Sequence, residues 1–224
     1  MENPWRNFDR KSKSMILSVD REAIEHYNSE KRSKATRVVK GSIPSPFIGS
    51  PSSARLVLLN LNPGHRGSDL EDQKKPNFRK AIVLTLKHEL KDYPFYPLNP
   101  KFRHTEAGKW WTKKLDRLRE ASELNDAILS RMIMVIEWFP YHSTKCGLPE
   151  KPICKSQEYS FYLAKKMFHK PGVITVGMRA MKRWRSADPE FEKVRFLRSN
   201  QNPCISRGNM DGRLFDRIIK RLRQ

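Results

Sequence analysis

The chain has 224 residues, enough to bury one sizeable hydrophobic core. Its 45 Lys and Arg against 24 Asp and Glu give a formal net charge of +21, which predicts a polyanionic partner such as nucleic acid. No apolar stretch approaches the roughly 20 residues that span a bilayer, and residues 1–8 lack the apolar core of a signal peptide, so a membrane protein is excluded and a cytoplasmic location is expected.

The cysteines bound the cofactor chemistry. Cys146, Cys154 and Cys204 make an odd number without C-x-x-C spacing, which argues against a disulfide framework and a tetrahedral zinc site. A cluster held by four thiolates is also one ligand short. We therefore expect three reduced thiols, no metal and no other cofactor.

The N-terminal part differs in composition from the rest. Residues 1–50 are polar and basic and predict an extension with one helix over about 20–37. A turn-rich stretch then leads to an α/β domain predicted over residues 51–224. Its first strand is predicted over residues 55–61, where a continuous apolar run is typical of a parallel strand covered on both faces.

Helical patterns alternate with apolar runs through the remainder of the chain. Three prolines in residues 93–100 predict an open aromatic loop. The alternation predicts a parallel sheet with right-handed crossovers. Helices are predicted over residues 77–91, 105–120, 156–169, 178–184 and 209–222, and strands over 132–138, 172–177 and 193–198.

Two short motifs each follow a predicted strand: residues 60–65 (NLNPGH) after the first and residues 200–207 (NQNPCISR) after the last. In an open parallel sheet, ligands bind in crevices at the carboxyl ends of the strands. We therefore expect the side-chain amides of Asn62 and Asn202 to face each other across one pocket. Taken singly, each Asn-Pro pair is also an ordinary turn, and that alternative stays open.

Together the two motifs resemble those of the uracil-DNA glycosylase superfamily, especially its mismatch-specific branch. In that family G-x-N-P-G follows the first strand and H/N-P-S follows the last; here Cys204 stands where Ser is usual. The resemblance covers about residues 55–223. It implies a three-layer α/β/α fold around a four-stranded parallel sheet, and hydrolysis of the N-glycosidic bond of a nucleotide flipped out of the stack.

The resemblance also assigns catalytic roles. Asn62 would orient the attacking water near C1′ of the sugar, and Asn202 would hydrogen-bond the departing base. His65 would assist the reaction, although capping of its own turn is an equally weighted alternative.

Base recognition is expected at the end of the second strand, where family members that act on uracil place an Asn. An ionised Glu137 there would only accept hydrogen bonds, which suits the amino group of a cytosine derivative, with Trp138, Phe139 or Tyr141 stacking nearby. A salt bridge from Glu137 to a surface Lys or Arg is the competing interpretation. Phe78 is a further candidate for stacking on the base, and a helix-core Phe is its alternative.

Contacts with DNA are expected outside the pocket. Trp110 and Trp111 would grip a single strand, unless one packs in the core and the other is exposed. Basic runs should contact phosphates rather than read sequence. The residues expected to contact DNA are Lys182, Arg183, Ile205, Ser206 and Arg207.

These observations predict a monofunctional DNA glycosylase that acts as a monomer on duplex DNA with a flipped base, or on a single strand, and leaves an abasic site. We favour a modified cytosine as the substrate, such as the glucosylated hydroxymethylcytosine that some bacterial relatives remove from phage DNA. A uracil or mismatched-thymine repair enzyme is one alternative. A catalytically silent nucleic-acid-binding module is the other.

Overall fold

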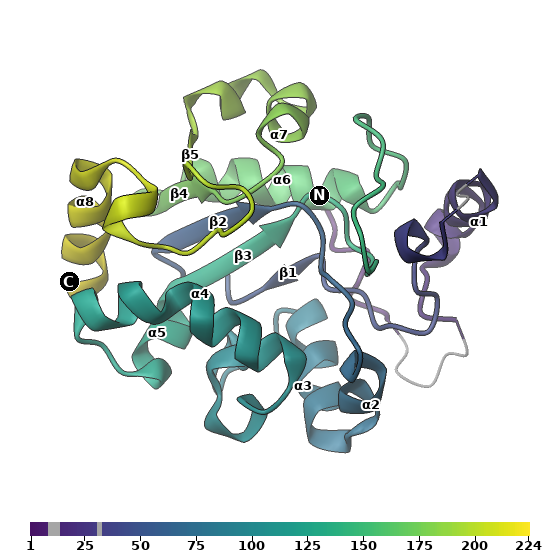
Figure 1. Cartoon of the computed structure of the whole chain (residues 1–224), viewed down its shortest axis with the longest axis horizontal. Coiled ribbons are helices and arrows are strands. Elements are labelled where there is room, and N and C mark those ends of the chain that lie inside the picture. The colour runs from purple at the N-terminus through teal and green to yellow at the C-terminus, as the bar shows by residue number, and fades with distance from the viewer. Residues whose placement is uncertain (9–13, 31–32) are drawn as a thin grey trace.

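A mixed β-sheet of five strands lies at the centre of the molecule (Figure 1). The computed structural model describes residues 1–8, 14–30 and 33–224. The strand order is β1-β3-β2-β4-β5, with β1 antiparallel to β3 and all other neighbours parallel. The strands are β1 Phe47–Ile48, β2 Leu56–Asn60, β3 Ile133–Glu137, β4 Ile174–Gly177 and β5 Arg195–Phe196.

The four parallel strands lie within the four predicted ranges. Every residue of β2 and β3 is buried, as expected of apolar strands covered on both faces. The prediction of a purely parallel, four-stranded sheet is wrong, because β1 adds an antiparallel strand at one edge. Two residues are too few to carry a periodic signal in the sequence.

Helices flank the sheet on two sides, with α6 and α7 above it and α3, α4 and α5 below it in Figure 1. Helix α6 packs against β2, β3 and β4, and α3 packs against β1. No helix in the described part of the chain has the length and apolar character to cross a membrane. The α-helices are α1 Arg21–Glu30, α2 Asp69–Lys74, α3 Pro76–Leu86, α4 Glu106–Ser122, α5 Asp126–Met132, α6 Gln157–Phe168, α7 Met181–Ala187 and α8 Gly212–Arg223.

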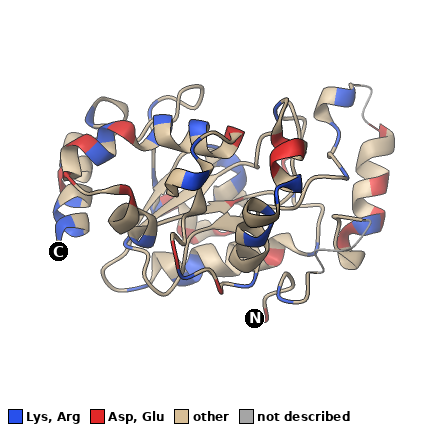
Figure 2. Cartoon of the chain, turned by 90° about the horizontal axis from the view of Figure 1, so that it is seen from below, with Lys and Arg blue, Asp and Glu red and all other residues tan. Residues whose placement is uncertain are grey.

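Two of these helices, α2 and α5, were not predicted, because each spans at most seven residues and shows no sustained period. The helix predicted over residues 20–37 is shorter in the structure: α1 ends at Glu30, and a 3-10 turn covers Lys34–Thr36. Residues 31–32 of that prediction lie outside the described residues. Basic side chains occur on most helices, with several along α8 near the C-terminus (Figure 2).

The segment over residues 93–100 is packed rather than open, which corrects the prediction of an open loop. Pro97 and Pro100 lie in the first turns of two 3-10 helices, Tyr96–Leu98 and Pro100–Phe102. Phe95 and Tyr96 are buried, and Phe95 meets Trp111 edge to face. The segment therefore packs beside α4 and forms part of the wall there.

The N-terminal residues join the same core as the sheet. Trp5 is fully buried and packs edge to face against Tyr141. The Asp20 carboxylate, also fully buried, accepts hydrogen bonds from the Tyr141 hydroxyl at 2.6 Å and the backbone N–H of Ser156 at 3.0 Å. This network ties the start of α1 to the loops that follow β3.

Candidate functional site

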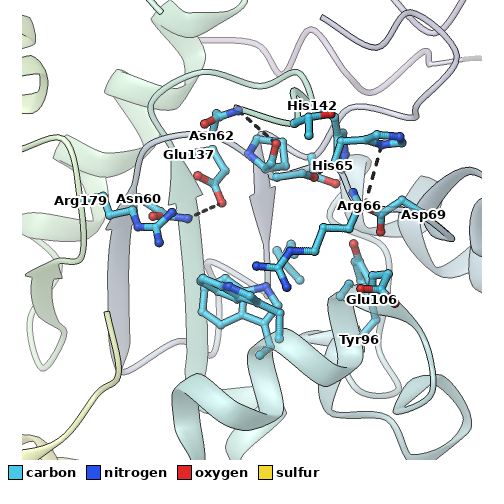
Figure 3. Close-up of a pocket in the computed structure, with 18 residues that line it drawn as sticks. Asn60, Asn62, His65, Arg66, Asp69, Tyr96, Glu106, Glu137, His142 and Arg179 are labelled. Carbon is cyan, nitrogen blue, oxygen red and sulfur yellow. Dashed lines mark hydrogen bonds and ion pairs between the residues drawn. The ribbon is translucent and has the colours of Figure 1, made fainter. Parts of the chain in front are cut away.

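A pocket of about 210 Å³ opens at the carboxyl ends of β2 and β3 (Figure 3). Its walls come from the turn after β2, the end of β3 and the loop beyond it, the 3-10 helix at Tyr96, the start of α4 and the loop after β4. Pockets for drug-sized ligands typically measure roughly 300–1,000 Å³. The smaller volume favours a ligand with a single ring.

Unsatisfied polar atoms gather around this pocket. Four of its lining side chains each carry a buried polar atom without a hydrogen bond: Asn60 Oδ1, His65 Nδ1, Glu137 Oε2 and His142 Nε2. Buried polar atoms in native proteins nearly always have a protein or water partner. A cluster of such atoms around one cavity therefore indicates a polar cavity that water or a polar ligand can fill.

Glu137 and Asn60 form a buried pair at the ends of β3 and β2. They occupy facing positions in the parallel register, and Asn60 Nδ2 donates to Glu137 Oε1 at 3.0 Å. Burial raises the pKa of Glu137 to about 8, and no described cation forms an ion pair with it. Among the described residues Glu137 therefore forms no surface salt bridge of the kind considered for it, and its burial favours the protonated carboxyl over the ionised one expected from the sequence.

Asn62 is held in one orientation by its amide nitrogen. Its Nδ2 donates to Pro63 O at 3.1 Å and to Ser143 Oγ at 3.0 Å. Both amide hydrogens are therefore engaged, which leaves Oδ1 to accept a hydrogen bond from a ligand or water. Ser143 belongs to the loop after β3, so the two strand ends fix this side chain together.

His142 lines the pocket with a neutral imidazole ring. Its Nδ1 lies 2.7 Å from Gly64 O, and because a carbonyl only accepts, Nδ1 must carry the proton. Burial lowers the pKa of His142 to about 4, so the ring is neutral at pH 7 and Nε2 is unprotonated. This residue was missed in the sequence, where its only signal is its place just beyond a buried strand.

His65 lines the pocket without capping its turn through Nδ1. That atom has no hydrogen bond and lies 3.9 Å from Asp69 Oδ2, while the backbone N–H of His65 donates to Ser143 O at 3.0 Å. Burial raises the pKa of Asp69, which lines the same wall.

Trp110 and two arginines form the mouth of the pocket. Trp111 is buried and meets the partly exposed Trp110 edge to face at 4.5 Å. The Lys114 ammonium and the Arg179 guanidinium lie 5.5 and 6.0 Å from the Trp110 ring centre. Arg66 is exposed and extends toward the pocket from the turn after β2 (Figure 3).

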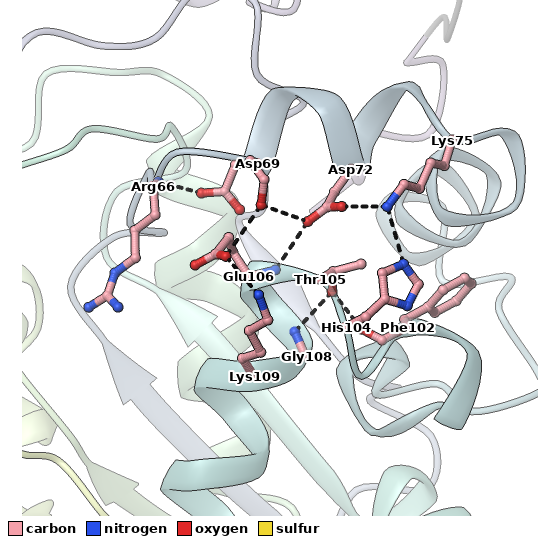
Figure 4. Close-up of polar contacts among 11 residues, drawn as sticks. Arg66, Asp69, Asp72, Lys75, Phe102, His104, Thr105, Glu106, Gly108 and Lys109 are labelled. Carbon is pink, nitrogen blue, oxygen red and sulfur yellow. Dashed lines mark hydrogen bonds and ion pairs between the residues drawn. The ribbon is translucent and has the colours of Figure 1, made fainter.

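A polar network joins the two helices that build this wall (Figure 4). Asp72 of α2 accepts hydrogen bonds from Lys75 Nζ at 2.8 Å and from the backbone N–H of Glu106 at 3.1 Å. Thr105 caps α4 by accepting from the backbone N–H of Gly108 at 3.0 Å. The start of α4, and with it the Trp110 side of the pocket, is thereby fixed to the turn after β2.

The second motif lies beside the pocket and not in its walls. Asn202 is exposed, and its Oδ1 accepts a hydrogen bond from Lys114 Nζ at 2.7 Å. Asn209 Nδ2 donates to Asn202 O at 3.1 Å and to Cys204 O at 3.0 Å, which holds the turn in shape. The expectation that Asn62 and Asn202 share one pocket is therefore not met in this structure. The motif is nevertheless close to the pocket, because Arg179, which lines it, donates from Nε to Asn200 O at 3.1 Å.

The aromatic residues predicted to stack on a base lie in the core. Phe78 packs against Tyr96 and Phe102, as its helix-core alternative requires. Trp138 and Phe139 are fully buried. Tyr141 is also buried, and none of the four predicted stacking residues lines the pocket, whereas Trp110 does.

The residues predicted to contact DNA divide between the core and the surface. Ile205 is fully buried, so it is not a wedge that enters a duplex in this conformation. Arg183 donates to two backbone carbonyls, those of Leu148 and Pro149. Lys182 is exposed, Ser206 is partly exposed, and Arg207 is exposed and paired with Asp216.

Sequence reasoning missed Asn60, Tyr96, Arg66 and Arg179, which all line the pocket. For Asn60 a signal was present, since a polar residue ends the apolar run of β2 as Glu137 ends that of β3. The two arginines stand in basic surroundings that give no local signal.

Among the described residues, no three His, Cys, Asp or Glu side chains gather as a metal site would require. No family model, no curated protein and no solved structure gives a significant match to this chain.

Proposed function

We propose that the protein is a DNA glycosylase that hydrolyses the N-glycosidic bond of a flipped pyrimidine nucleotide and leaves an abasic site. The observation that carries the proposal is the pocket of single-ring size in which Asn62 and His65 meet Glu137 from the neighbouring strand. The resemblance of the two motifs to the uracil-DNA glycosylase superfamily supports it. So do their positions, one after β2 and the other after β5, in the parallel part of a sheet flanked by helices.

Hydrolysis requires a water oriented at C1′ and a group that takes its proton. Asn62 Oδ1 accepts a hydrogen bond from this water, since both hydrogens of Nδ2 are already bound. As the water oxygen bonds to C1′, the Nε2 lone pair of His142 accepts the proton directly or through a second water, with His65 as the other lining histidine. The electron pair of the broken C1′–N bond leaves with the base.

The pocket walls support a monofunctional reaction. A glycosylase that forms a covalent intermediate needs an amine nucleophile, typically a lysine. The described residues that line the pocket include Arg66 and Arg179 but no lysine, and Lys114 is engaged with Asn202 nearby.

The mouth supports binding of DNA. Arg66 and Arg179 supply positive charge where the phosphates of a flipped nucleotide would pass, and the partly exposed Trp110 offers an aromatic face to a base. The net charge of +21 favours association of the whole chain with a polyanion. The identity of the pyrimidine, whether a modified cytosine, uracil or thymine in a mismatch, is the part of the proposal that a substrate panel decides.

The test uses labelled duplexes and single strands that contain uracil, thymine opposite guanine, or hydroxymethylcytosine with and without glucose. Alkali then cleaves any abasic site. We expect the wild-type chain to release at least one of these bases, and Asn62→Ala to slow that release by about 100-fold or more. Asn77→Ala, at an exposed position of α3 outside the pocket, is the matched control and should behave as wild type.

Salt-sensitive binding of DNA by the wild-type chain without release from any substrate would contradict the proposal. That outcome would favour a silent binding module. Release that Asn62→Ala leaves unchanged would contradict the assigned role of this residue.

A further inference from the structure

An amide and a carboxyl occupy facing positions at the inner end of the pocket. Asn60 and Glu137 are 4% and 3% exposed, and the 3.0 Å hydrogen bond from Asn60 Nδ2 to Glu137 Oε1 joins them. The backbone there is fixed as well, because Asn60 O accepts from the indole N–H of Trp184 at 2.8 Å and from the backbone N–H of Trp138 at 3.2 Å. One oxygen of each side chain, Asn60 Oδ1 and Glu137 Oε2, makes no hydrogen bond.

The surroundings of Glu137 disfavour a negative charge. A carboxylate buried without a paired cation is costly, and such a group keeps its proton. Arg179 is the cation that acts on Glu137, but the two form no ion pair within the described chain, and its Nε is bound to Asn200 O. Burial accordingly raises the pKa of Glu137 to about 8.

The other titratable groups that face this pocket do little to stabilise a negative charge on Glu137. Tyr96 contributes a buried hydroxyl, and His142 is neutral because burial lowers its pKa to about 4. Asp69 and Glu106 on the opposite wall are themselves acidic. His65 and Arg66 complete the set of titratable and charged groups around the pocket, and neither pairs with Glu137.

We propose that Glu137 binds the base as a neutral acid, its Oε2 hydroxyl donating to a ring nitrogen or carbonyl while Asn60 Oδ1 accepts from the adjacent N–H. Because Oε1 already accepts from Asn60, the proton resides on Oε2. The ligand class is then a pyrimidine edge with one acceptor beside one donor, as in N3 and the amino group of cytosine or O4 and N3–H of uracil. If Glu137 were ionised, its Oε2 and Asn60 Oδ1 would both be hydrogen-bond acceptors. The acceptor atom of either base edge would then face another acceptor and be repelled.

This inference rests on the proposed function and gives it a specificity-determining pair.

The first test exploits the likeness of glutamine to a protonated glutamate. Glu137→Gln keeps a carbonyl for Asn60 and a donor for the base, so at pH 7 it should release base about tenfold or more faster than Glu137→Ala. Glu137→Ala leaves Asn60 without its partner and should lose about tenfold or more. Above pH 8 the wild-type rate should fall about tenfold per unit as the acid ionises, while the rate of Glu137→Gln should not. A Glu137→Gln enzyme that is inactive, with a wild-type rate that rises with pH through 5, would overturn the neutral acid.

A second readout needs no substrate. The pKa of the Glu137 carboxyl in the folded protein lies above its ordinary value of 4.5. The protonated carboxyl therefore contributes fully to the stability of the fold below pH 4.5, and this contribution is lost as the pH rises to about 8. The unfolding equilibrium constant of wild type relative to Glu137→Gln should therefore rise about tenfold per pH unit across this window. Glu158→Gln, at an exposed position of α6 outside the pocket, is the matched control for the loss of one carboxyl group.

If the unfolding equilibrium constant of wild type relative to Glu137→Gln does not change with pH, the inference is overturned. If that relative unfolding constant changes with pH but no base is released from any substrate, Glu137 is a neutral acid beside Asn60 and the proposed function is wrong. The two failures are therefore distinguishable.

Discussion

Two Asn-Pro turns that look alike in the sequence have opposite surroundings in the fold. The turn after β2 borders a pocket, and its Asn62 amide is fixed by Ser143 with one oxygen left over. The turn after β5 lies beside the pocket mouth, and there the Asn202 oxygen is already taken by Lys114. The difference shows that a short motif specifies a turn, whereas the side chains that pack on the turn decide whether its amide is available to a ligand.

The largest expected effect separates the two asparagines. We expect Asn62→Ala to slow base release by about 100-fold or more, because it removes the acceptor for the water. Asn202→Ala should cost at most about tenfold, the worth of one hydrogen bond, because Asn202 does not line the pocket. Single-turnover rates on the best substrate measure both. Equal losses would break the comparison and would mean that Asn202 enters the pocket when DNA binds.

A smaller effect is expected on the stability of the turn after β5. Asn209 donates to Asn202 O and Cys204 O, and its Oδ1 accepts from the backbone N–H of Ser199 at 2.8 Å. We expect Asn209→Ala to lower the free energy of unfolding by about 1–3 kcal/mol, since these backbone groups lose their partners. Urea denaturation measures the change, and Asn77→Ala should stay within about 0.5 kcal/mol of wild type.

Hydrogen exchange compares the stability of the turn after β2 with that of the turn after β5. Amides of residues 199–205 should exchange faster in Asn209→Ala, while those of the turn after β2 should not. Loss of protection in both turns would mean that they are one cooperative unit and not two separately held ones.

The parts of the fold that could be predicted are those with a local cause. The apolar runs of β2 and β3 predict buried parallel strands, and the amphipathic pattern of α8 predicts a helix. The prolines of residues 93–100 do not mark an open loop, because proline also suits the first turn of a helix, where Pro97 and Pro100 lie in two 3-10 helices.

The site divides in the same way. Asn62 and His65 lie just after a buried strand and Glu137 ends the next one, so their places can be predicted because the carboxyl ends of parallel strands meet at one edge. The contact between Lys114 and Asn202 spans 88 residues, so no local pattern reveals it. The protonation of Glu137 is equally hidden, because it depends on burial and on the absence of an ion pair and not on residue type.

The smallest expected effect compares the arginines of the two turns in binding to DNA. Arg66 is exposed and forms no ion pair within the described chain, whereas Arg207 is paired with Asp216. If Arg66 contacts a phosphate, Arg66→Gln should reduce the slope of log K against log salt on duplex DNA by about 0.9. Arg207→Gln should change it less, because Arg207 must first give up its carboxylate, and binding titrations at several salt concentrations measure both slopes. Equal reductions would show that DNA contacts the two turns alike, and the asymmetry between them would then be confined to the pocket.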